Sequence, residues 1–341
     1  MLSSASSVVS YQKFQTSYYY LIHQLLFGVL PGLTLFFIAS KIYYHKWQKL
    51  SLYFLVATIL LLIAVFIPGI GAGYGKAKSW ILFPGLSLQP AEIAKLTFIL
   101  YLSSLLEKRG RKITDVHFGL LPFLFLTGII SVLIVLQPDF GTLSVIVLTS
   151  LVIYFVAGGK FLHLSLIGLG GLGLLVLLIK SAPYRAERLA VFLNPGIDPQ
   201  GIGYHINQAL IAVGSGGLFG VGLGNSRQKF AYLPEVFSDS IFAVIAEEMG
   251  FLICAALVIL FLILLYRGFK IAKNSPDTFG KLVACGITFW FVFQAMINIM
   301  SMIGLMPMTG LPLPFISYGG SAMTVSLFAV GVLVNISKQT R

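Results

Sequence analysis

The feature that most constrains the fold is a series of apolar runs, each about as long as a membrane-spanning helix. The runs cover residues 18–40, 50–70, 87–106, 118–138, 140–159, 161–180, 239–266, 281–303 and 316–336. A helix needs about 20 apolar residues to cross the hydrocarbon core of a bilayer. With 57% hydrophobic and 10% charged residues, the chain is more apolar than a soluble core requires. We therefore predict an all-α polytopic membrane protein with nine transmembrane helices, in a single domain over residues 1–341.

The basic residues indicate which helix ends share a side of the membrane. Fourteen of the 23 Lys and Arg residues fall between or after the runs on one side: Lys41, Lys46, Lys49, Lys108, Arg109, Arg111, Lys112, Lys160, Arg267, Lys270, Lys273, Lys281, Lys338 and Arg341. Cytoplasmic loops are enriched in such bases, so we assign this side to the cytoplasm. The net charge of +12 then reflects topology, and we expect no nucleic-acid partner. The external side carries the N-terminal segment, interpreted as a tail, and a large loop over residues 181–238.

A charged segment from Asn225 to Glu248 concentrates the polar chemistry. It holds four of the eleven acidic residues and two bases: Glu235, Asp239, Glu247, Glu248, Arg227 and Lys229. Charged side chains beside or within a membrane are rare and commonly functional. Asp239 stands where the next apolar run begins, so it can either cap that helix or act as a reactive carboxylate. The residues alone leave both interpretations open.

Charged residues elsewhere also have two interpretations. Glu92 and Lys95 are spaced i,i+3, so they can neutralise each other on one helix or bind a ligand phosphate. Arg185 and Arg188 have the same spacing, which suits phosphate oxygens or lipid headgroups. Asp139 precedes an apolar run, and we expect it to cap the helix that follows.

Several patterns exclude other classes of site. Gly168, Gly170 and Gly173 fit G-x-G-x-x-G, but they lie within an apolar run without a preceding strand, which favours close helix packing over a dinucleotide site. No Walker motif occurs, so a nucleotide-driven pump is disfavoured. Cys254 and Cys285 lie in apolar runs and are interpreted as small buried hydrophobes. The five histidines show no metal-ligand spacing, and we interpret them as packed or solvated.

Five motifs, taken together, resemble the SEDS family of bacterial proteins for shape, elongation, division and sporulation. The motifs are WILFPGLSLQPAEIAK, QPDFGT, YRAERLAVFLNPGIDPQGIGYH, GNSRQKFAYLPE and GLPLPFISYGGS. They span essentially the whole chain, and GNSRQKF before YLPE resembles the division branch, FtsW, more than the elongation branch, RodA. The resemblance implies a ten-helix fold in the bacterial plasma membrane with its active site outside the cytoplasm. This chain is expected to begin inside the first of those helices.

The resemblance also implies an activity, polymerisation of lipid II by a peptidoglycan glycosyltransferase during cell division. Lipid II is a disaccharide peptide linked to undecaprenyl pyrophosphate. A sugar hydroxyl of one molecule attacks the anomeric carbon of another, which requires a base and cations for the departing pyrophosphate. The implied partners are a class B penicillin-binding protein transpeptidase, other membrane proteins of the division complex and the lipid bilayer. No cofactor is required, although a divalent cation such as Mg²⁺ or Mn²⁺ could share the role of the bases.

The resemblance assigns Asp239, which follows YLPE, to the family's essential external aspartate, and we expect it to be the general base. The family usually has His-Thr before this aspartate, where this chain has Phe237 and Ser238. Glu235 leaves open a two-carboxylate retaining mechanism, but Pro234 interrupts any helix between the two acids and favours direct displacement with inversion. The expected substrate-binding residues are Lys229, Arg227, Arg185, Arg188 and Lys95, together with Glu235, Trp80 and Ser317.

Two rival functions remain at this stage. A bundle with intramembrane Glu92, Lys95, Glu247 and Glu248 could transport lipid II across the bilayer. Alternatively, the chain could be a non-catalytic scaffold of the division complex. A transporter predicts critical charges in the middle of the membrane, whereas a transferase predicts them at the external edge.

Overall fold

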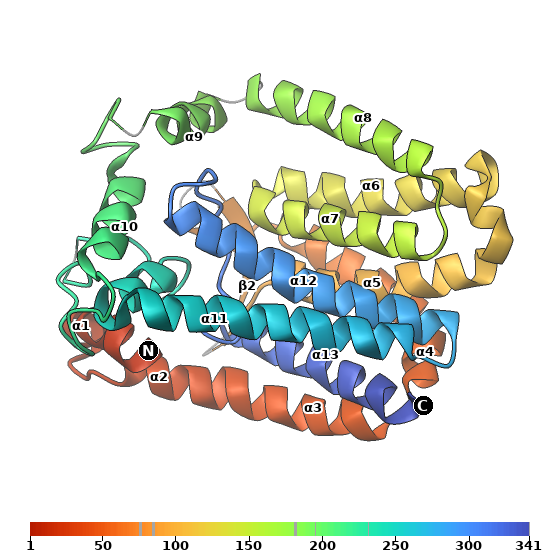
Figure 1. Ribbon diagram of the computed structural model, residues 1–341, viewed down its shortest axis with the longest axis horizontal. Helices are drawn as coiled ribbons and strands as arrows, with labels where there is room; N and C mark the ends of the chain where they lie inside the picture. Colours follow the sequence, from red (N-terminus) through yellow and green to blue (C-terminus); the bar gives the residue numbers. More distant parts are fainter. Residues whose placement is uncertain (75–76, 84–85, 181–182, 195, 231, 341) are drawn as a thin grey trace. The chain divides into compact units, whose positions relative to one another are not determined.

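The computed structural model describes residues 1–341 except 75–76, 84–85, 181–182, 195, 231 and 341 (Figure 1). The chain divides into two compact units. Unit 1 comprises Met1–Gln24, Ser165–Leu262 and Gln294–Gly319, and unit 2 comprises Leu25–Leu164, Ile263–Phe293 and Gly320–Arg341. The assignment of one domain over residues 1–341 stays a prediction.

Both units are built mainly from helices. Unit 1 contains α1 (Leu2–Phe14), α2 (Tyr19–Gln24), α9 (Pro183–Leu193) and α10 (Tyr204–Ser215). Unit 2 contains η1 (Leu25–Val29), α3 (Leu30–Lys41), α4 (Tyr44–Ala64), β1 (Gly71–Tyr74), β2 (Ala77–Phe83), β3 (Leu86–Leu88), α5 (Pro90–Arg109), η2 (Gly110–Thr114), η3 (Val116–Leu120), α6 (Leu121–Leu136), α7 (Phe140–Val156) and α13 (Gly320–Gln339). The residues of α8 (Phe161–Lys180), α11 (Ile241–Lys273) and α12 (Thr278–Met302) are shared between the units.

Each of the nine apolar runs contains a helix, which confirms the all-α polytopic class. Within the described part of the chain, seven helical stretches are long and apolar enough to cross a membrane: Tyr19–Lys41, Tyr44–Ala64, Val116–Leu136, Phe161–Lys180, Ile241–Lys273, Thr278–Met302 and Gly320–Gln339. The other two runs form α5, which carries charged residues at both ends, and α7, which has 17 residues. The count of nine spans therefore stays a prediction.

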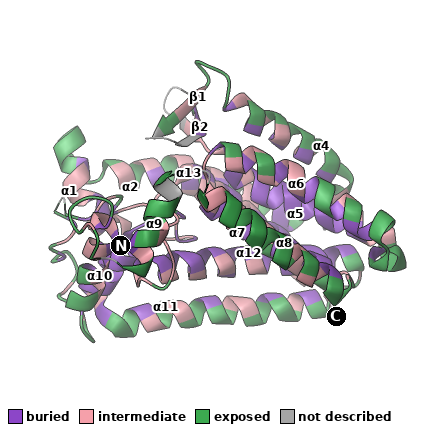
Figure 2. Cartoon of the chain, turned by 90° about the horizontal axis from the view of Figure 1, so that it is seen from above, coloured by how far each residue is buried: buried purple, intermediate pink, exposed green. Residues whose placement is uncertain are grey.

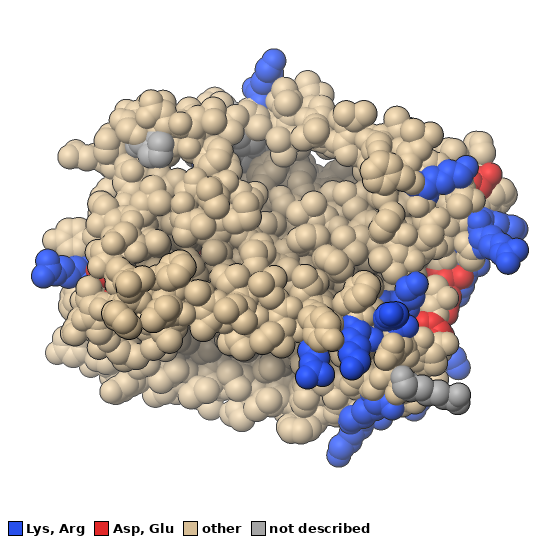
Figure 3. Space-filling view, in the orientation of Figure 1, with Lys and Arg blue, Asp and Glu red and all other residues tan. Residues whose placement is uncertain are grey.

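The ends of several helices meet at one end of unit 2. Asn335 near the end of α13 accepts from the Tyr44 amide at the start of α4, and its Nδ2 donates to Ser40 O at the end of α3, both at 3.0 Å. The Phe279 amide of α12 donates to Glu107 of α5 at 3.3 Å. Lys and Arg side chains gather at this end (Figure 3). The grouping of helix ends inferred from the bases is thus present within unit 2.

Helix α5 is largely enclosed within unit 2. Fourteen of its 20 residues are buried, and Figure 2 shows it mostly in the colour of buried residues. Pro90 occupies the first turn and Gly110 the C-cap, which is the usual asymmetry of helix ends. The expected contact between Glu92 and Lys95 is confirmed, because Lys95 Nζ donates to Glu92 Oε1 at 2.7 Å and each side chain is 1% exposed.

The segment before α5 folds as a small antiparallel sheet that the apolar pattern did not predict. Its strand order is β1-β2-β3, and Trp80 of β2 pairs with Ala72 of β1. Strands of three to seven residues are too short to show clear alternation. Trp80 is therefore placed on a strand within unit 2.

The N-terminal segment is a helix, so its interpretation as a tail was wrong. Helix α1 buries Ala5, Ser6 and Ser10, and Ala5 belongs to the core of unit 1. Small side chains allow close contact between helices, and hydropathy alone does not register this property. Helix α1 also places Ser4 in contact with the charged side chain of Lys229.

The glycines of α8 do not support close packing within this chain. A Cβ added at Gly168, Gly170, Gly171 or Gly173 would meet no atom within 4 Å. Among the described residues of α8, only His163 is buried. The packing interpretation of these glycines was therefore wrong for contacts among the described residues of unit 1.

Two smaller predictions are confirmed. Asp139 caps α7, because its Oδ1 accepts from the Thr142 amide at 2.9 Å. Cys254 and Cys285 are buried and unbridged. Both observations agree with a structural role for these residues.

Helix α11 is broken at Gly250, which has φ 75° and ψ −176°. The loop around Val221 in unit 1 forms hydrogen bonds with the backbone carbonyls that the break leaves without helical partners. The amides of Val221 and Gly222 donate to the carbonyls of Glu247 and Glu248 at 2.9 and 3.0 Å. Interrupted membrane helices are stable only where such groups find partners, so this loop is an integral part of the helix break.

Replacement of Gly250 by Ala is expected to destabilise the protein. The backbone conformation is nearly exclusive to glycine, which implies a penalty of about 1–3 kcal/mol. A Cβ would also lie 2.3 Å from Gly220 N and 2.6 Å from Leu218 O. Thermal unfolding in detergent should show a lower midpoint for Gly250→Ala, whereas the control Gly168→Ala, in open space on α8, should retain the wild-type midpoint or exceed it. Equal midpoints for Gly250→Ala and the wild type would contradict this interpretation.

Candidate active site

Asp239 lies immediately before the N-cap position of α11. The helix begins at Ile241, and the Ala243 amide donates to Ser240 O at 3.0 Å, which places Ser240 at the cap position. The capping interpretation of Asp239 therefore does not describe this geometry. The Asp239 side chain is only 8% exposed, so its carboxyl group is held in a largely enclosed place at the helix entrance.

Asn298 of α12 fixes the backbone of Asp239. Its Nδ2 donates to both Asp239 O and Leu311 O at 2.7 Å. The loop after α12 that contains Leu311 also places Gly310 beside the Asp239 carboxyl group, since a Cβ on Gly310 would lie 3.7 Å from Asp239 Oδ2. The carboxyl group is thus positioned from two sides of unit 1, by α12 and by the loop that follows it.

Ser317 and Tyr318 hold the two residues before Asp239. Ser317 Oγ donates to Ser238 O at 2.5 Å and accepts from the Leu313 amide at 2.7 Å. The Tyr318 amide donates to Phe237 O at 2.8 Å. Ser317, expected from the sequence to bind substrate, is buried and positions the segment that leads to Asp239.

The pKa of the Asp239 carboxyl group is raised from its ordinary value to about 7, first by burial and second by the negative charge of Glu235. Glu235 adopts a φ of 48°, and its carbonyl accepts from the amides of Ser238 and Ser240 at 3.1 and 3.2 Å. This turn replaces a helix between the two acids, as Pro234 led us to expect. A carboxyl group with a pKa near neutrality can accept and release a proton efficiently at neutral pH.

A histidine from α10 reaches the same turn. His205 Nε2 lies 2.7 Å from Ser240 Oγ, and this hydroxyl donates to Pro234 O at 2.8 Å and lies 3.5 Å from Asp239 Oδ1. Burial, and then the positive charge of Arg188, lower the pKa of His205 to about 4. The imidazole is therefore neutral at neutral pH, and a proton on Nε2 can be donated to Ser240 Oγ.

Phe237, two positions before the acid where the resemblance associates histidine, is part of an aromatic stack. The Phe237 ring stacks on Tyr20 with centroids 4.4 Å apart and meets Tyr318 edge-on at 5.5 Å. Tyr318 OH also lies 2.9 Å from His23 Nδ1. A phenyl ring has no exchangeable proton, so Phe237 contributes packing to the site. The hydroxyl of Ser240, which contacts both the carboxyl group and His205, is a proton-carrying group beside Asp239.

Lys229 is buried within a charged cluster. Its Nζ donates to Glu248 Oε1 at 2.9 Å, Ser4 Oγ at 3.0 Å and Gly224 O at 2.5 Å. These acceptors match the three protons of an ammonium group, and the side chain is 3% exposed. In this arrangement Lys229 joins α1, the loop before Asp239 and α11.

The side chain of Glu247 holds the loop before Asp239. Its carboxylate accepts from Ser226 Oγ at 2.5 Å and from the Arg227 amide at 2.9 Å. The two adjacent glutamates therefore fix the segment that carries Lys229. The Arg227 side chain itself is exposed.

The other expected phosphate ligands occupy different surroundings. Arg188 of α9 is exposed, and its guanidinium donates to Met308 O at 3.3 Å in unit 1. Arg185 is on α9 as expected, but its side chain lies outside the described residues. Lys95 belongs to unit 2, where its Nζ lies 5.1 Å from the Trp290 ring centroid as well as beside Glu92. The structure thus places Arg188 and Arg227, but neither Lys95 nor Trp80, in the unit that holds Asp239.

Sequence reasoning missed three residues that position Asp239, namely Asn298, Ser240 and His205. A detectable signal existed for Asn298, because a polar amide in an apolar run must find a partner inside the protein. His205 and Ser240 had no such signal, since they are 35 positions apart. Among the described residues, no group of three or more His, Cys, Asp or Glu is arranged to hold a metal ion.

Comparison with known proteins agrees with this architecture. A sequence model of the family described as "Cell cycle protein", FtsW/RodA/SpoVE, matches residues 1–341. The chain belongs to the FtsW/RodA/SpoVE family. It is 44% identical over 341 residues to stage V sporulation protein E of Bacillus subtilis, covering 100% of this chain and 93% of that protein. It is also 39% identical to the probable peptidoglycan glycosyltransferase FtsW of Trichlorobacter lovleyi, covering 99% of this chain and 88% of that one.

Solved structures of the FtsW/RodA/SpoVE family have the same fold. One, described as "Structural coordination of polymerization and crosslinking by a peptidoglycan synthase complex", aligns with a TM-score of 0.81 at 30% identity, covering 99% of this chain and 95% of its own. The rod shape determining protein RodA of Thermus thermophilus aligns with a TM-score of 0.71 at 29% identity, covering 99% and 94%. The family resemblance expected from the five motifs is confirmed.

Proposed function

We propose that this chain is a peptidoglycan glycosyltransferase of cell division that polymerises lipid II, with Asp239 as the general base. The observation that carries the proposal is the buried Asp239 carboxyl group, whose pKa is raised to about 7 at the entrance of α11. The names of the relatives support the reaction class, since several are called probable peptidoglycan glycosyltransferases. An acid fixed by Asn298 has the rigidity that a positioned base requires.

The proposed reaction is a direct displacement. The ionised Asp239 carboxylate takes the proton from an acceptor sugar hydroxyl, whose oxygen then bonds to the anomeric carbon of a second lipid-linked sugar. The bond from that carbon to the pyrophosphate oxygen breaks, and the pyrophosphate lipid leaves with the electron pair. Exposed Arg227 and Arg188 are suited to hold its oxygens, whereas Lys229 is already bound to three acceptors.

A divalent cation that shares the role of the bases is a further part of the proposal. Among the described residues no group of three or more His, Cys, Asp or Glu is arranged to hold it, so Glu235 and the pyrophosphate oxygens would be its ligands, and Asp239 would stay free to accept a proton. Bound there, such an ion would supply positive charge to the pyrophosphate. Treatment with EDTA is expected to lower the polymerisation rate, and added Mg²⁺ or Mn²⁺ should restore it.

The proposed setting is the bacterial plasma membrane, with Asp239 facing outside the cytoplasm. The basic residues that separate the apolar runs on the other side of the predicted topology would face the cytoplasm, as the positive-inside rule requires. The structural relative described as a peptidoglycan synthase complex supports a class B penicillin-binding protein as the partner. Other proteins of the division complex remain proposed partners on the basis of the family alone.

The pH dependence of polymerisation tests the role of Asp239. Because its folded-state pKa lies above the ordinary value of 3.8, the carboxylate is scarce at acidic pH. The rate should therefore rise as pH increases and level off above about 7. In the variant Glu235→Gln the rise should move to lower pH, because a neighbouring negative charge is removed. A rate that stays constant from about pH 5 to about pH 9, roughly two units on either side of that pKa, would contradict the assignment.

The same shift has a consequence for stability, with the opposite sign. A carboxyl group that binds its proton more tightly when folded stabilises the protein most at pH below its unfolded pKa. That contribution is lost as pH rises from about 3.8 to about 7. Activity and the stability contribution of Asp239 are therefore expected to change in opposite directions over this range.

A further inference from the structure

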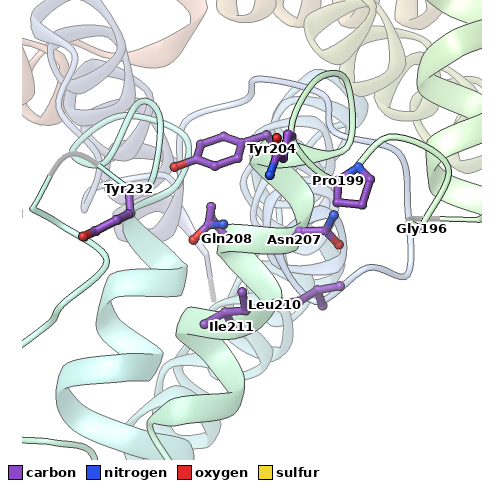
Figure 4. Close-up of a pocket in the computed structure, with 9 residues that line it drawn as sticks. Gly196, Pro199, Tyr204, Asn207, Gln208, Leu210, Ile211 and Tyr232 are labelled. Carbon is purple, nitrogen blue, oxygen red and sulfur yellow. The ribbon is translucent and has the colours of Figure 1, made fainter.

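A pocket of about 820 Å³ lies along α10 in unit 1. Its lining comes from α10 and from loops on either side of it: Gly196, Pro199, Gln200, Tyr204, Asn207, Gln208, Leu210, Ile211 and Tyr232. In Figure 4 the side chains of Tyr204 and Gln208 extend from α10 on the side of Tyr232, and Asn207 lies on the side of Pro199. The volume is within the usual range for small-molecule sites.

The pocket contains neutral hydrogen-bonding groups and aromatic rings. Three of its residues, Gln200, Asn207 and Gln208, have carboxamides, and two, Tyr204 and Tyr232, have phenol groups. No Asp, Glu, Lys or Arg is among the described lining residues. Carboxamides both donate and accept hydrogen bonds, which suits hydroxyl and acetamido groups. The absence of cations among these lining residues makes the pocket a poor place for pyrophosphate.

Helix α10 connects the pocket to the proposed base. Tyr204, Asn207 and Gln208 lie on one face at helical spacing, while Ala209 and Ala212 are buried in the core of unit 1. His205, next to Tyr204, contacts Ser240 Oγ at 2.7 Å beside Asp239. Tyr232 is three positions before Glu235. The helix and the loop that line the pocket are therefore the same segments that contact, or lead into, the turn that carries both acids.

We propose that this pocket binds the sugar backbone of the glycan strand, through its neutral hydroxyl and acetamido groups, while Asp239 acts at the reacting end. The inference rests on the proposed function and adds the location of one substrate. Different parts of the substrate would then bind at different places. The neutral sugars would bind along α10, and the pyrophosphate would bind at the exposed arginines. The stem peptide, which carries charged groups, is not the expected occupant.

Direct binding of an uncharged oligosaccharide tests the proposal without requiring turnover. The probe is chitotetraose, a neutral N-acetylglucosamine oligomer, and the readout is saturation-transfer NMR on the full chain in detergent. Wild type and Asp239→Asn are expected to bind it. Gln208→Leu and Asn207→Leu should each weaken binding by about 3- to 10-fold, the value of one lost hydrogen bond. Gln12→Leu, an exposed position on α1 that does not line the pocket, is the matched control.

Tyr232→Phe provides a second variant in case the α10 substitutions impair folding, because it removes only one hydroxyl. Pocket variants that bind chitotetraose like the wild type would overturn the proposal, as would binding of an isolated stem peptide that alone depends on Gln208. Polymer formation in a parallel lipid II assay keeps the two claims separate. Pocket-dependent binding without any polymer would contradict the proposed function, whereas normal polymer with no pocket dependence would contradict only this inference.

Discussion

Replacement of Asp239 by Asn is expected to abolish polymer formation from lipid II while leaving the protein folded. Asparagine has nearly the same shape, and the Asn298 contact involves the Asp239 backbone carbonyl, which the substitution retains. The lost group is the proton acceptor, whose contribution to catalysis is typically about 10²- to 10⁴-fold. The measurement is gel analysis of glycan strands made by purified protein, with thermal unfolding as the test of folding.

Glu235→Gln is the matched control for Asp239→Asn. It changes the neighbouring carboxylate in the same chemical way, and the single-base mechanism predicts that it retains activity with a shifted pH profile. A two-carboxylate retaining mechanism instead predicts that both variants are inactive. Substantial polymer from Asp239→Asn would contradict the assignment of the base.

Replacement of Lys229 by Met is expected to be the most destabilising single change in the charged cluster. It leaves Glu248 buried without its cationic partner, and breaking a buried ion pair from one side costs about 3–5 kcal/mol. The loop before Asp239 would also lose its contact with Ser4 of α1. Thermal unfolding in detergent should show a clearly lower midpoint than the wild type.

The double variant Lys229→Met/Glu248→Gln distinguishes a structural lysine from a phosphate ligand. Removing both charges eliminates the unpaired carboxylate, so stability should recover in part, and a polymerisation rate limited by folding should recover with it. If Lys229 binds pyrophosphate directly, the double variant will be stable but inactive. The exposed Arg227→Gln serves as the comparison, because it should lower the rate without changing the unfolding midpoint.

The sequence predicts the helices of this protein well because hydrophobic length is a local property. The break of α11 at Gly250 was not predictable, since the position reads as part of an apolar run and its conformation depends on hydrogen bonds to the loop near Gly220. The sheet containing Trp80 and the burial of α1 were also missed. Each depends on contacts between segments, which periodicity does not contain.

In the candidate site, too, local features were predictable and contacts between distant segments were not. Asp239 and Glu235 were identifiable because acids are rare in an apolar chain and follow a recognisable motif. Lys229 was expected to bind substrate, and its contacts with Ser4 and Glu248 were not foreseen. These partners are 225 and 19 positions away along the chain, so local pattern does not reveal them. His205 looked unremarkable as an isolated histidine, and only the fold brings it to Ser240.

The central claim is that Asp239 performs glycosyl transfer, and the most direct test measures two activities of the same preparations. Wild type and Asp239→Asn are assayed for glycan polymer from lipid II and, in liposomes, for movement of lipid II between leaflets. We predict polymer from the wild type, none from Asp239→Asn, and no difference between the two in lipid movement. Lipid movement that depends on Asp239, or polymer that does not, would contradict it.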